Sequence, residues 1–344
     1  MKDPVSCLGA GKRVLFAQNF VQRSICRQEV DGIEKILERF HLFEAQRHED
    51  DENHVDRAGG RRNDLRTDSA DIYVPLLLEH PQTGLQYRTF EREDDLSALL
   101  IDAYEIENKG KRDIWYPILP TPCICLYVKF GETTGGTLLC GATTAMEKIR
   151  IEPGCAVFCV RFRVGVADFF TSTALGRLTN KVDCLEPLLP GVAALCQELQ
   201  RSESFRERVL RTSRHIRTDY YAATYQPHVD LNRSLEMIHR NHGIVRVSEV
   251  AESIGCSERY LCKLFQNLVG LSTKQYCEIV KLQNSLRDIL TRRPKALAKT
   301  AAAYGYFDQP HMNRVYQKFL GRTASDMRFF DHESCNTPSI ASIL

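Results

Sequence analysis

Two clusters of polar side chains, about fifty residues apart, carry the residue types that read base pairs in DNA. An arginine can form two hydrogen bonds with a guanine, and a glutamine or asparagine can form two with an adenine. Lysine and hydroxyl side chains beside them are suited to phosphate oxygens, which position a protein on the duplex without selecting a sequence. The candidate base-contacting residues are Arg259, Cys262, Lys263, Gln309, His311, Asn313 and Arg314. The candidate phosphate-contacting residues are Ser257, Lys274, Lys281, Lys318 and Arg322.

Both clusters follow the same pattern of small and apolar residues. In a helix-turn-helix unit the two helices cross closely, so the fifth position must be small and the ninth must tolerate a left-handed turn. Ala251 and Gly255 meet these requirements in the first segment, and Ala301 and Gly305 meet them 50 residues later. Two matches in register within one basic segment predict two helix-turn-helix units.

The offset between the two units changes from 50 residues before the turn to 51 after it, where Ser257 corresponds to Asp308. One additional residue in the second turn explains this change. The predicted recognition helices cover about residues 258–269 and 309–320, and the Ser257 hydroxyl is expected to cap the first. Between the units, residues 273–290 predict a helix ~27 Å long, which would place the recognition helices ~34 Å apart in two successive major grooves.

The charge distribution indicates a polyanionic partner for the C-terminal third. The whole chain has a net charge of +2. Residues 1–229 contain 30 basic and 33 acidic residues, a charge of −3, whereas residues 230–330 contain 16 and 9, a charge of +7; residues 331–344 contribute −2. A segment this basic next to a slightly acidic one is typical of a nucleic-acid-binding domain.

Residues 231–330 resemble the DNA-binding domain of the AraC/XylS transcription regulators. The most specific stretch runs from Tyr304 to Gly321 and contains Tyr-Gly-Tyr-Phe-Asp-Gln-Pro-His-Met-Asn-Arg. Pro310, Met312 and Tyr316 stand where the family usually has Ser, Phe and Phe; a proline in the first helical turn leaves the fold intact because its missing amide is not needed there. The resemblance implies base and backbone contacts for Arg259, Cys262 and Lys263.

Residues 88–215 resemble, more loosely, the sensor-like domain of one AraC subgroup. The stretches that carry this resemblance are 118–120, 160–165 and 178–180. The two resemblances together imply a transcription regulator or activator bound to double-stranded DNA, with an N-terminal domain for effector sensing or dimerisation. A small-molecule effector, RNA polymerase and a second copy of the chain are the further partners that this interpretation admits.

Short apolar segments between residues 71 and 162 predict strands, and the pattern after Gly165 becomes helical. The predicted strands are 115–119, 123–130, 137–140, 148–151 and 156–162. We expect an α+β protein with a β-rich N-terminal domain, as a small barrel or sandwich plus helices, and an all-α C-terminal domain. The predicted divisions are a charged, disordered or dispensable extension (1–70), the β-rich domain (71–219), a linker (220–229), the DNA-binding domain (230–330) and a tail (331–344).

The β-rich region offers little for metal or enzyme chemistry. No histidine occurs between Pro81 and Arg214, which argues against a histidine-based metal site. Strand alternation places Cys123, Cys125 and Tyr127 on one face, as small buried residues would lie. We therefore expect no catalytic residue, metal or cofactor. A thiol- or metal-dependent sensor or DNA-linked enzyme that uses these cysteines stays open, as does a non-specific DNA-compacting protein, which the mixed polar recognition helices disfavour.

The sequence favours a cytoplasmic protein without membrane association. No apolar stretch approaches the ~20 residues of a membrane span, and the N-terminus has no signal-peptide core. The 13 cysteines are an odd number in a long chain, which favours reduced thiols.

Overall fold

The structure is a computed structural model, and it describes residues 75–78, 85–91, 100–131, 136–165, 174–184, 190–222 and 228–328. All of them belong to one compact unit, Asp68–Leu344. The predicted extension and tail, residues 1–70 and 331–344, lie outside the described residues.

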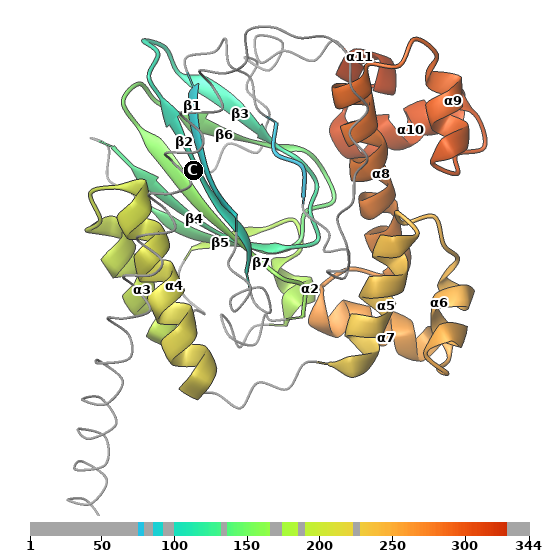
Figure 1. The fold of residues 1–344 in the computed structure, drawn as a ribbon, viewed down its shortest axis with the longest axis horizontal. Coiled ribbons are helices and arrows are strands. Elements are labelled where there is room, and N and C mark those ends of the chain that lie inside the picture. Colours follow the sequence, from blue (N-terminus) through green and yellow to red (C-terminus); the bar gives the residue numbers. More distant parts are fainter. Residues whose placement is uncertain are drawn as a thin grey trace, which may run out of the picture. The chain divides into compact units, whose positions relative to one another are not determined.

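The β-rich region contains two antiparallel sheets (Figure 1). The larger sheet has the strand order β1-β2-β7-β4-β5-β8, and the smaller one pairs β3 with β6. Their bounds are β1 Leu85–Glu91, β2 Leu100–Asn108, β3 Ile114–Ile118, β4 Ile124–Phe130, β5 Thr137–Cys140, β6 Glu147–Ile151, β7 Ala156–Phe162 and β8 Val182–Cys184. The five predicted strands are present to within one residue at each end, whereas β1, β2 and β8 were not predicted.

The two faces of the larger sheet pack against different partners. Cys125 and Tyr127 lie on the inner face together with Tyr116 of the smaller sheet, in one buried cluster, as the alternation along β4 predicts. On the opposite face, the Phe158 ring contacts Phe205 edge-on, with centroids 5.9 Å apart. Helices α3 (Pro190–Gln200) and α4 (Phe205–Ala222) cover that face.

A buried ion pair joins α4 to the sheet. The Glu105 carboxylate of β2 is 1% exposed and accepts hydrogen bonds from Arg88 Nη1 at 2.7 Å and Arg208 Nε at 2.8 Å. The Arg208 guanidinium also lies over the Phe130 ring, 4.1 Å from its centroid. Because a buried carboxylate needs charged or hydrogen-bonding partners, these two arginines make β2 compatible with a buried position.

The C-terminal region is helical throughout, which confirms the predicted fold class. Its helices are α5 Val229–Arg240, α6 Val247–Ser253, α7 Glu258–Leu268, α8 Thr273–Arg292, α9 Leu297–Ala303, α10 Gln309–Leu320 and α11 Ala324–Arg328. Helix α8 buries ten of its 20 residues and lies between the other helices of the region (Figure 1). Helices α5, α7, α9 and α11 each pack against α8, which therefore forms the centre of the region.

Helical structure extends further into the predicted linker than the sequence indicated. The predicted linker covers residues 220–229, but α4 continues to Ala222 and α5 begins at Val229. Residues 220–222 contain no proline or glycine to end α4, and the first proline is Pro227, so the helix can continue.

Hydrogen bonds connect the β-rich region to three parts of the helical region. Gln283 of α8 accepts from the Leu76 amide through Oε1 at 2.8 Å and donates to the Pro120 carbonyl through Nε2. Two further bonds reach the C-terminal ends of α7 and α10: Thr179 Oγ1 donates to the Gly270 carbonyl, and the Met146 amide donates to the Phe319 carbonyl, both at 2.7 Å. In the described part of the chain, no helix is long and apolar enough to cross a membrane.

Candidate nucleic-acid interface

The first helix-turn-helix unit consists of α6 and α7. Ala251 is 2% exposed where the two helices cross, and Gly255 adopts φ +71° in the turn. Leu261 and Phe265 of α7 are fully buried, so the opposite side of α7 is left for solvent. The small and left-handed positions predicted from the sequence thus have the expected geometry.

The second unit consists of α9 and α10 and is fastened to α8 by a polar contact. Gly305 has φ +64°, and a side chain there would approach Ile244 Cγ2 to 2.7 Å. The Tyr316 hydroxyl lies 2.8 Å from Ser285 Oγ of α8, and the Tyr306 hydroxyl lies 3.2 Å from the same atom. The hydroxyl of Tyr316, where the family usually has a phenylalanine, therefore has a partner in the core.

In α7, the exposed side contains several of the predicted DNA-contacting residues. Arg259 and Lys263 are exposed and Cys262 is half-buried. The Ser257 hydroxyl accepts a hydrogen bond from the Tyr260 amide at 3.2 Å and caps α7, as predicted. Its first structural role is therefore to stabilise the N-terminus of this helix. Tyr260, which was not predicted as a site residue, donates its hydroxyl to Asp230 Oδ2 at 3.1 Å, and this contact raises its pKa.

The predicted base-contacting side chains of α10 differ in whether they form hydrogen bonds within the protein. Arg314 is exposed and Gln309 is half-buried. The Asn313 oxygen Oδ1 accepts from the Ala324 amide at 3.2 Å, although a two-bond contact with adenine would need that same oxygen. His311 Nδ1 accepts from the Phe307 amide at 3.2 Å, which leaves Nε2 as the nitrogen able to donate outward.

The predicted phosphate-contacting residues also differ in their exposure and contacts. Lys274 is exposed at the start of α8 and Arg322 is half-buried after α10. Lys318 Nζ lies 3.1 Å from Glu278 Oε2 on the surface. Lys281 instead lies over the Tyr306 ring, 4.6 Å from its centroid, and burial lowers its pKa. This position gives Lys281 a packing role, and we omit it from the proposed phosphate contacts.

One exposed residue beside the interface escaped the sequence reasoning. Phe307, in the turn before α10, is 92% exposed. The change of offset from 50 to 51 residues located an insertion in this turn but did not reveal which residue was added or where its side chain points.

Known proteins with similar sequences support the assignment of two helix-turn-helix units to this region. A family model described as a helix-turn-helix domain matches residues 250–328, from within α6 to the end of α11. The Msm operon regulatory protein of Streptococcus mutans is 27% identical over 100 residues, which are 28% of this chain and 35% of that protein. Residues 250–328 therefore match a helix-turn-helix family, which agrees with the resemblance of residues 231–330 to the AraC/XylS regulators, and we call residues 229–328 the AraC-type domain. The match spans only about a third of the Msm regulator's length.

A second family model matches the region before the AraC-type domain, and solved structures resemble a larger part of the chain. Residues 91–183 match a family described as a domain of unknown function (DUF6597). A crystal structure of ToxT from Vibrio cholerae has a TM-score of 0.33 at 10% identity, covering 72% of this chain and 98% of that one. A ToxT structure with a bound unsaturated fatty acid has a TM-score of 0.32 at 10% identity, covering 73% and 97%. Similarity this low does not extend to ligands.

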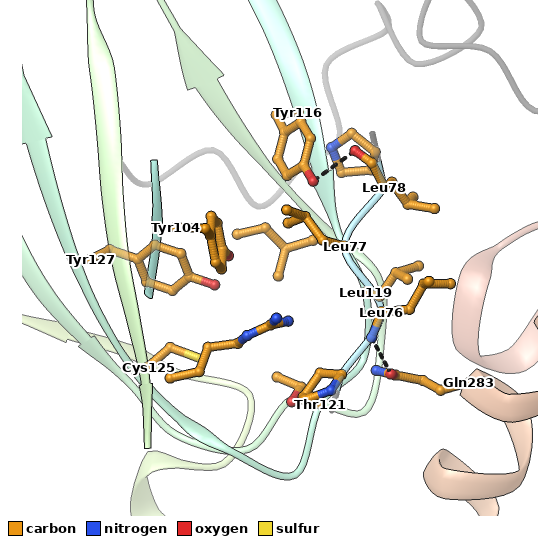
Figure 2. Close-up of a pocket in the computed structure, with 14 residues that line it drawn as sticks. Leu76, Leu77, Leu78, Tyr104, Tyr116, Leu119, Thr121, Cys125, Tyr127 and Gln283 are labelled. Atoms are coloured by element: carbon orange, nitrogen blue, oxygen red, sulfur yellow. Dashed lines mark hydrogen bonds between the residues drawn. The ribbon is translucent and has the colours of Figure 1, made fainter. Parts of the chain in front are cut away.

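A small pocket lies between the β-rich region and α8 of the AraC-type domain. The Leu77 side chain points into it, toward the rings of Tyr104 and Tyr127 (Figure 2). The buried Arg161 guanidinium, which also lines the pocket, pairs with Asp102, with Nε 2.6 Å from Oδ1. Segment 75–78 thus forms one wall of this pocket.

Two thiols near this pocket, Cys123 and Cys125, have raised pKa values. The pKa of Cys125 is raised well above its ordinary value, first by its contact with the Cys159 thiol and then by burial. Burial likewise raises the pKa of Cys123 to about 12. Thiolates are the reactive and metal-binding form, and among the residues that the structure describes, no group of three or more histidine, cysteine or acidic side chains is arranged to hold a metal ion.

Proposed function

We propose that this protein is a sequence-specific transcription regulator that inserts α7 and α10 into two successive major grooves. The observation that carries this proposal is the rigid connection between the two units through α8. Its 20 residues span about 30 Å at 1.5 Å per residue, close to the ~34 Å that separates successive major grooves on one face of DNA. Because α8 is packed along its length, the separation of the recognition helices is set before DNA binds.

The proposed contacts follow the exposure of the side chains. Arg259 and Lys263 of α7 and Arg314 of α10 are the leading base contacts; Cys262, Gln309, His311 and the amide nitrogen of Asn313 are secondary ones. Lys274, Lys318 and Arg322 are proposed phosphate contacts, and so is Ser257 at the N-terminus of α7. The division into domains 71–219 and 230–330, a cytoplasmic location, the lack of enzymatic activity, and contacts with RNA polymerase or a second copy belong to this proposal.

The test compares two substitutions in the full chain, Arg259→Ala and Lys274→Ala. The chain is incubated with genomic fragments, with and without excess competitor DNA, and the retained fragments are sequenced. Arg259→Ala should cost about 1–3 kcal/mol on preferred fragments and relax the preference at one base position. Lys274→Ala should weaken binding to all fragments about equally, and it should reduce the salt dependence of binding by the contribution of about one phosphate contact.

Retention of all fragments alike by the unchanged protein would contradict sequence-specific binding and favour DNA compaction. Equal loss on every fragment from both substitutions would contradict the division between base and phosphate contacts.

We also propose that the β-rich domain senses a small molecule through segment 75–78. Leu77 packs against the inner cluster of the sheets, whereas Leu76 and Leu78 pack with the core of the AraC-type domain. The backbone of Leu76 is bonded to Gln283 of α8. A ligand that took the place of Leu77 would therefore move a segment that α8 holds.

The pocket can be tested by filling it. A panel of small molecules is screened for an increase in the melting temperature of the wild-type chain, and each active compound is measured again with Leu77→Trp and with the exposed control Gln266→Leu. Compounds that stabilise the wild type and the control but not Leu77→Trp support this site. Compounds that stabilise all three proteins equally bind elsewhere and contradict it.

A further inference from the structure

The second helix-turn-helix unit contains one residue more than the first, and that residue is Phe307. In the first turn the Cys256 amide donates to the Ala251 carbonyl at 3.0 Å; in the second, the Tyr306 amide donates to the Ala301 carbonyl at 2.9 Å. Cys256 and Tyr306 therefore occupy the same position. The next residue of the first unit, Ser257, is already the N-cap, whereas Phe307 precedes the second N-cap, Asp308.

The turn around Phe307 is firmly held, although its side chain is exposed. Tyr306 is 4% exposed, and its hydroxyl contacts Ser285. Asp308 Oδ1 accepts from the His311 amide at 2.6 Å, and the Phe307 amide donates to His311 Nδ1. The 92% exposure of Phe307 is thus imposed by anchored neighbours on both sides. The next most exposed large apolar side chain among the described residues is Val229, at 60%.

We propose that the Phe307 ring packs against the C5-methyl group of a thymine in the half-site read by α10. This rests on the proposed function. Phe307 lies two positions before α10 begins at Gln309, and Pro310 and Arg314 of that helix are also exposed, so we place the ring in the same proposed DNA interface. Thymine alone presents a methyl group in the major groove, and apolar side chains read it by contact.

The first unit has no counterpart to this contact. Its turn is one residue shorter, and Cys256 is half-buried. The second unit therefore selects a base by apolar contact, in addition to the hydrogen bonds available to both. Loss of the methyl group should weaken binding about fourfold, the equivalent of one buried methylene-sized group.

The experiment uses a duplex that the full wild-type chain selects from a random-sequence library. Each thymine is replaced in turn by deoxyuracil, which keeps the base pairing and removes only the methyl group, and affinity is measured for the wild type, Phe307→Ala and Val229→Ala. We expect the wild type and Val229→Ala to lose about fourfold at one thymine of the second half-site. Phe307→Ala should bind the thymine and uracil duplexes equally.

Three results would overturn the inference. Phe307→Ala could respond to each uracil as the wild type does, which would show that the ring does not contact a methyl group. Unchanged DNA affinity with reduced transcription in vitro would instead assign the ring to RNA polymerase. If the wild type selects no preferred duplex at all, the proposed function itself fails, and this outcome is distinct from the other two.

Discussion

Gln283→Leu removes the polar bridge that connects α8 to the β-rich region while nearly preserving side-chain volume. Gln283 is 1% exposed, and the substitution leaves the Leu76 amide and the Pro120 carbonyl without this partner. Loss of a partner costs a buried polar group about 1–3 kcal/mol, or about 2–6 kcal/mol for the two groups. Burial of the leucine offsets about 1–2 kcal/mol of this. These ranges combine to a net loss of about 0–5 kcal/mol, and we expect about 2–3 kcal/mol from their midpoints.

The assay combines urea unfolding of the full chain with hydrogen exchange of a peptide that contains Leu76. If the bridge holds segment 75–78, its amides should exchange faster in Gln283→Leu, about tenfold for each 1.4 kcal/mol lost locally. The matched control is Gln266→Leu, at an exposed position of α7, which should leave both measurements near the wild-type values. Unchanged exchange at Leu76 together with unchanged stability would refute the stabilising role of this bridge.

Three further predictions concern the cysteines and glycines. At pH 7.5 iodoacetamide should modify the half-buried Cys256 and Cys262 in the native protein, whereas the seven cysteines that are buried among the described residues should react only after unfolding. Detection by mass spectrometry of a buried thiol that is modified equally fast would contradict their protection. Burial raises the pKa of Cys277 to about 12 from an ordinary value of 9, so the unfolded chain loses this proton first, and stability should fall above pH 9 by about 1.4 kcal/mol per pH unit from this group. Cys277→Ala should flatten the fall measured by urea unfolding between pH 9 and 10.5, and an unaltered slope would argue against the shift. Gly243 and Gly255 both have positive φ, but a Cβ at Gly243 would lie 2.4 Å from the Cys277 carbonyl oxygen, with no atom within 4 Å at Gly255. Gly255→Ala should therefore cost about 1–2 kcal/mol and Gly243→Ala about 1–3 kcal/mol more, and equal losses in thermal unfolding would disprove the close approach.

The AraC-type domain was predictable because its determinants are local in the sequence. The small residue at Ala251, the turn glycine at Gly255 and the cap at Ser257 act within a few residues of one another. Each determines a local backbone feature, and the spacing of the apolar residues then predicts the helix beside it. The predicted recognition helices therefore agree with α7 and α10 to within one residue at each end.

Strand β2 could not be predicted in this way. Its sequence carries Asp102, Glu105 and Glu107 among apolar residues, which obscures the alternation of a buried strand. Glu105 is tolerated in the core because Arg88 of β1 and Arg208 of α4 neutralise it. One of these partners lies 103 positions away in the sequence, and no local pattern reveals such a pair.

The sequence predicts positions for the proposed interface, but it does not predict which atoms at those positions are already hydrogen-bonded within the protein. The sequence placed Asn313 and Lys281 near the DNA-binding surface. It could not show that the Asn313 oxygen is bonded to the Ala324 amide or that the Lys281 ammonium lies over Tyr306. These contacts join different helices, so they emerge only when the helices pack.

The two recognition helices differ in sequence, with Glu258-Arg259-Tyr260 at the start of one and Gln309-Pro310-His311 at the start of the other. They also follow each other in a single chain and are joined by one rigid helix. If the chain acts as proposed, its site needs no palindrome, since its two halves would read unlike sequences in a fixed order. Such a site on DNA would have a polarity, and inverting it would turn the β-rich domain to face the opposite direction along the duplex. The orientation of the site relative to a promoter would then be part of the regulatory signal.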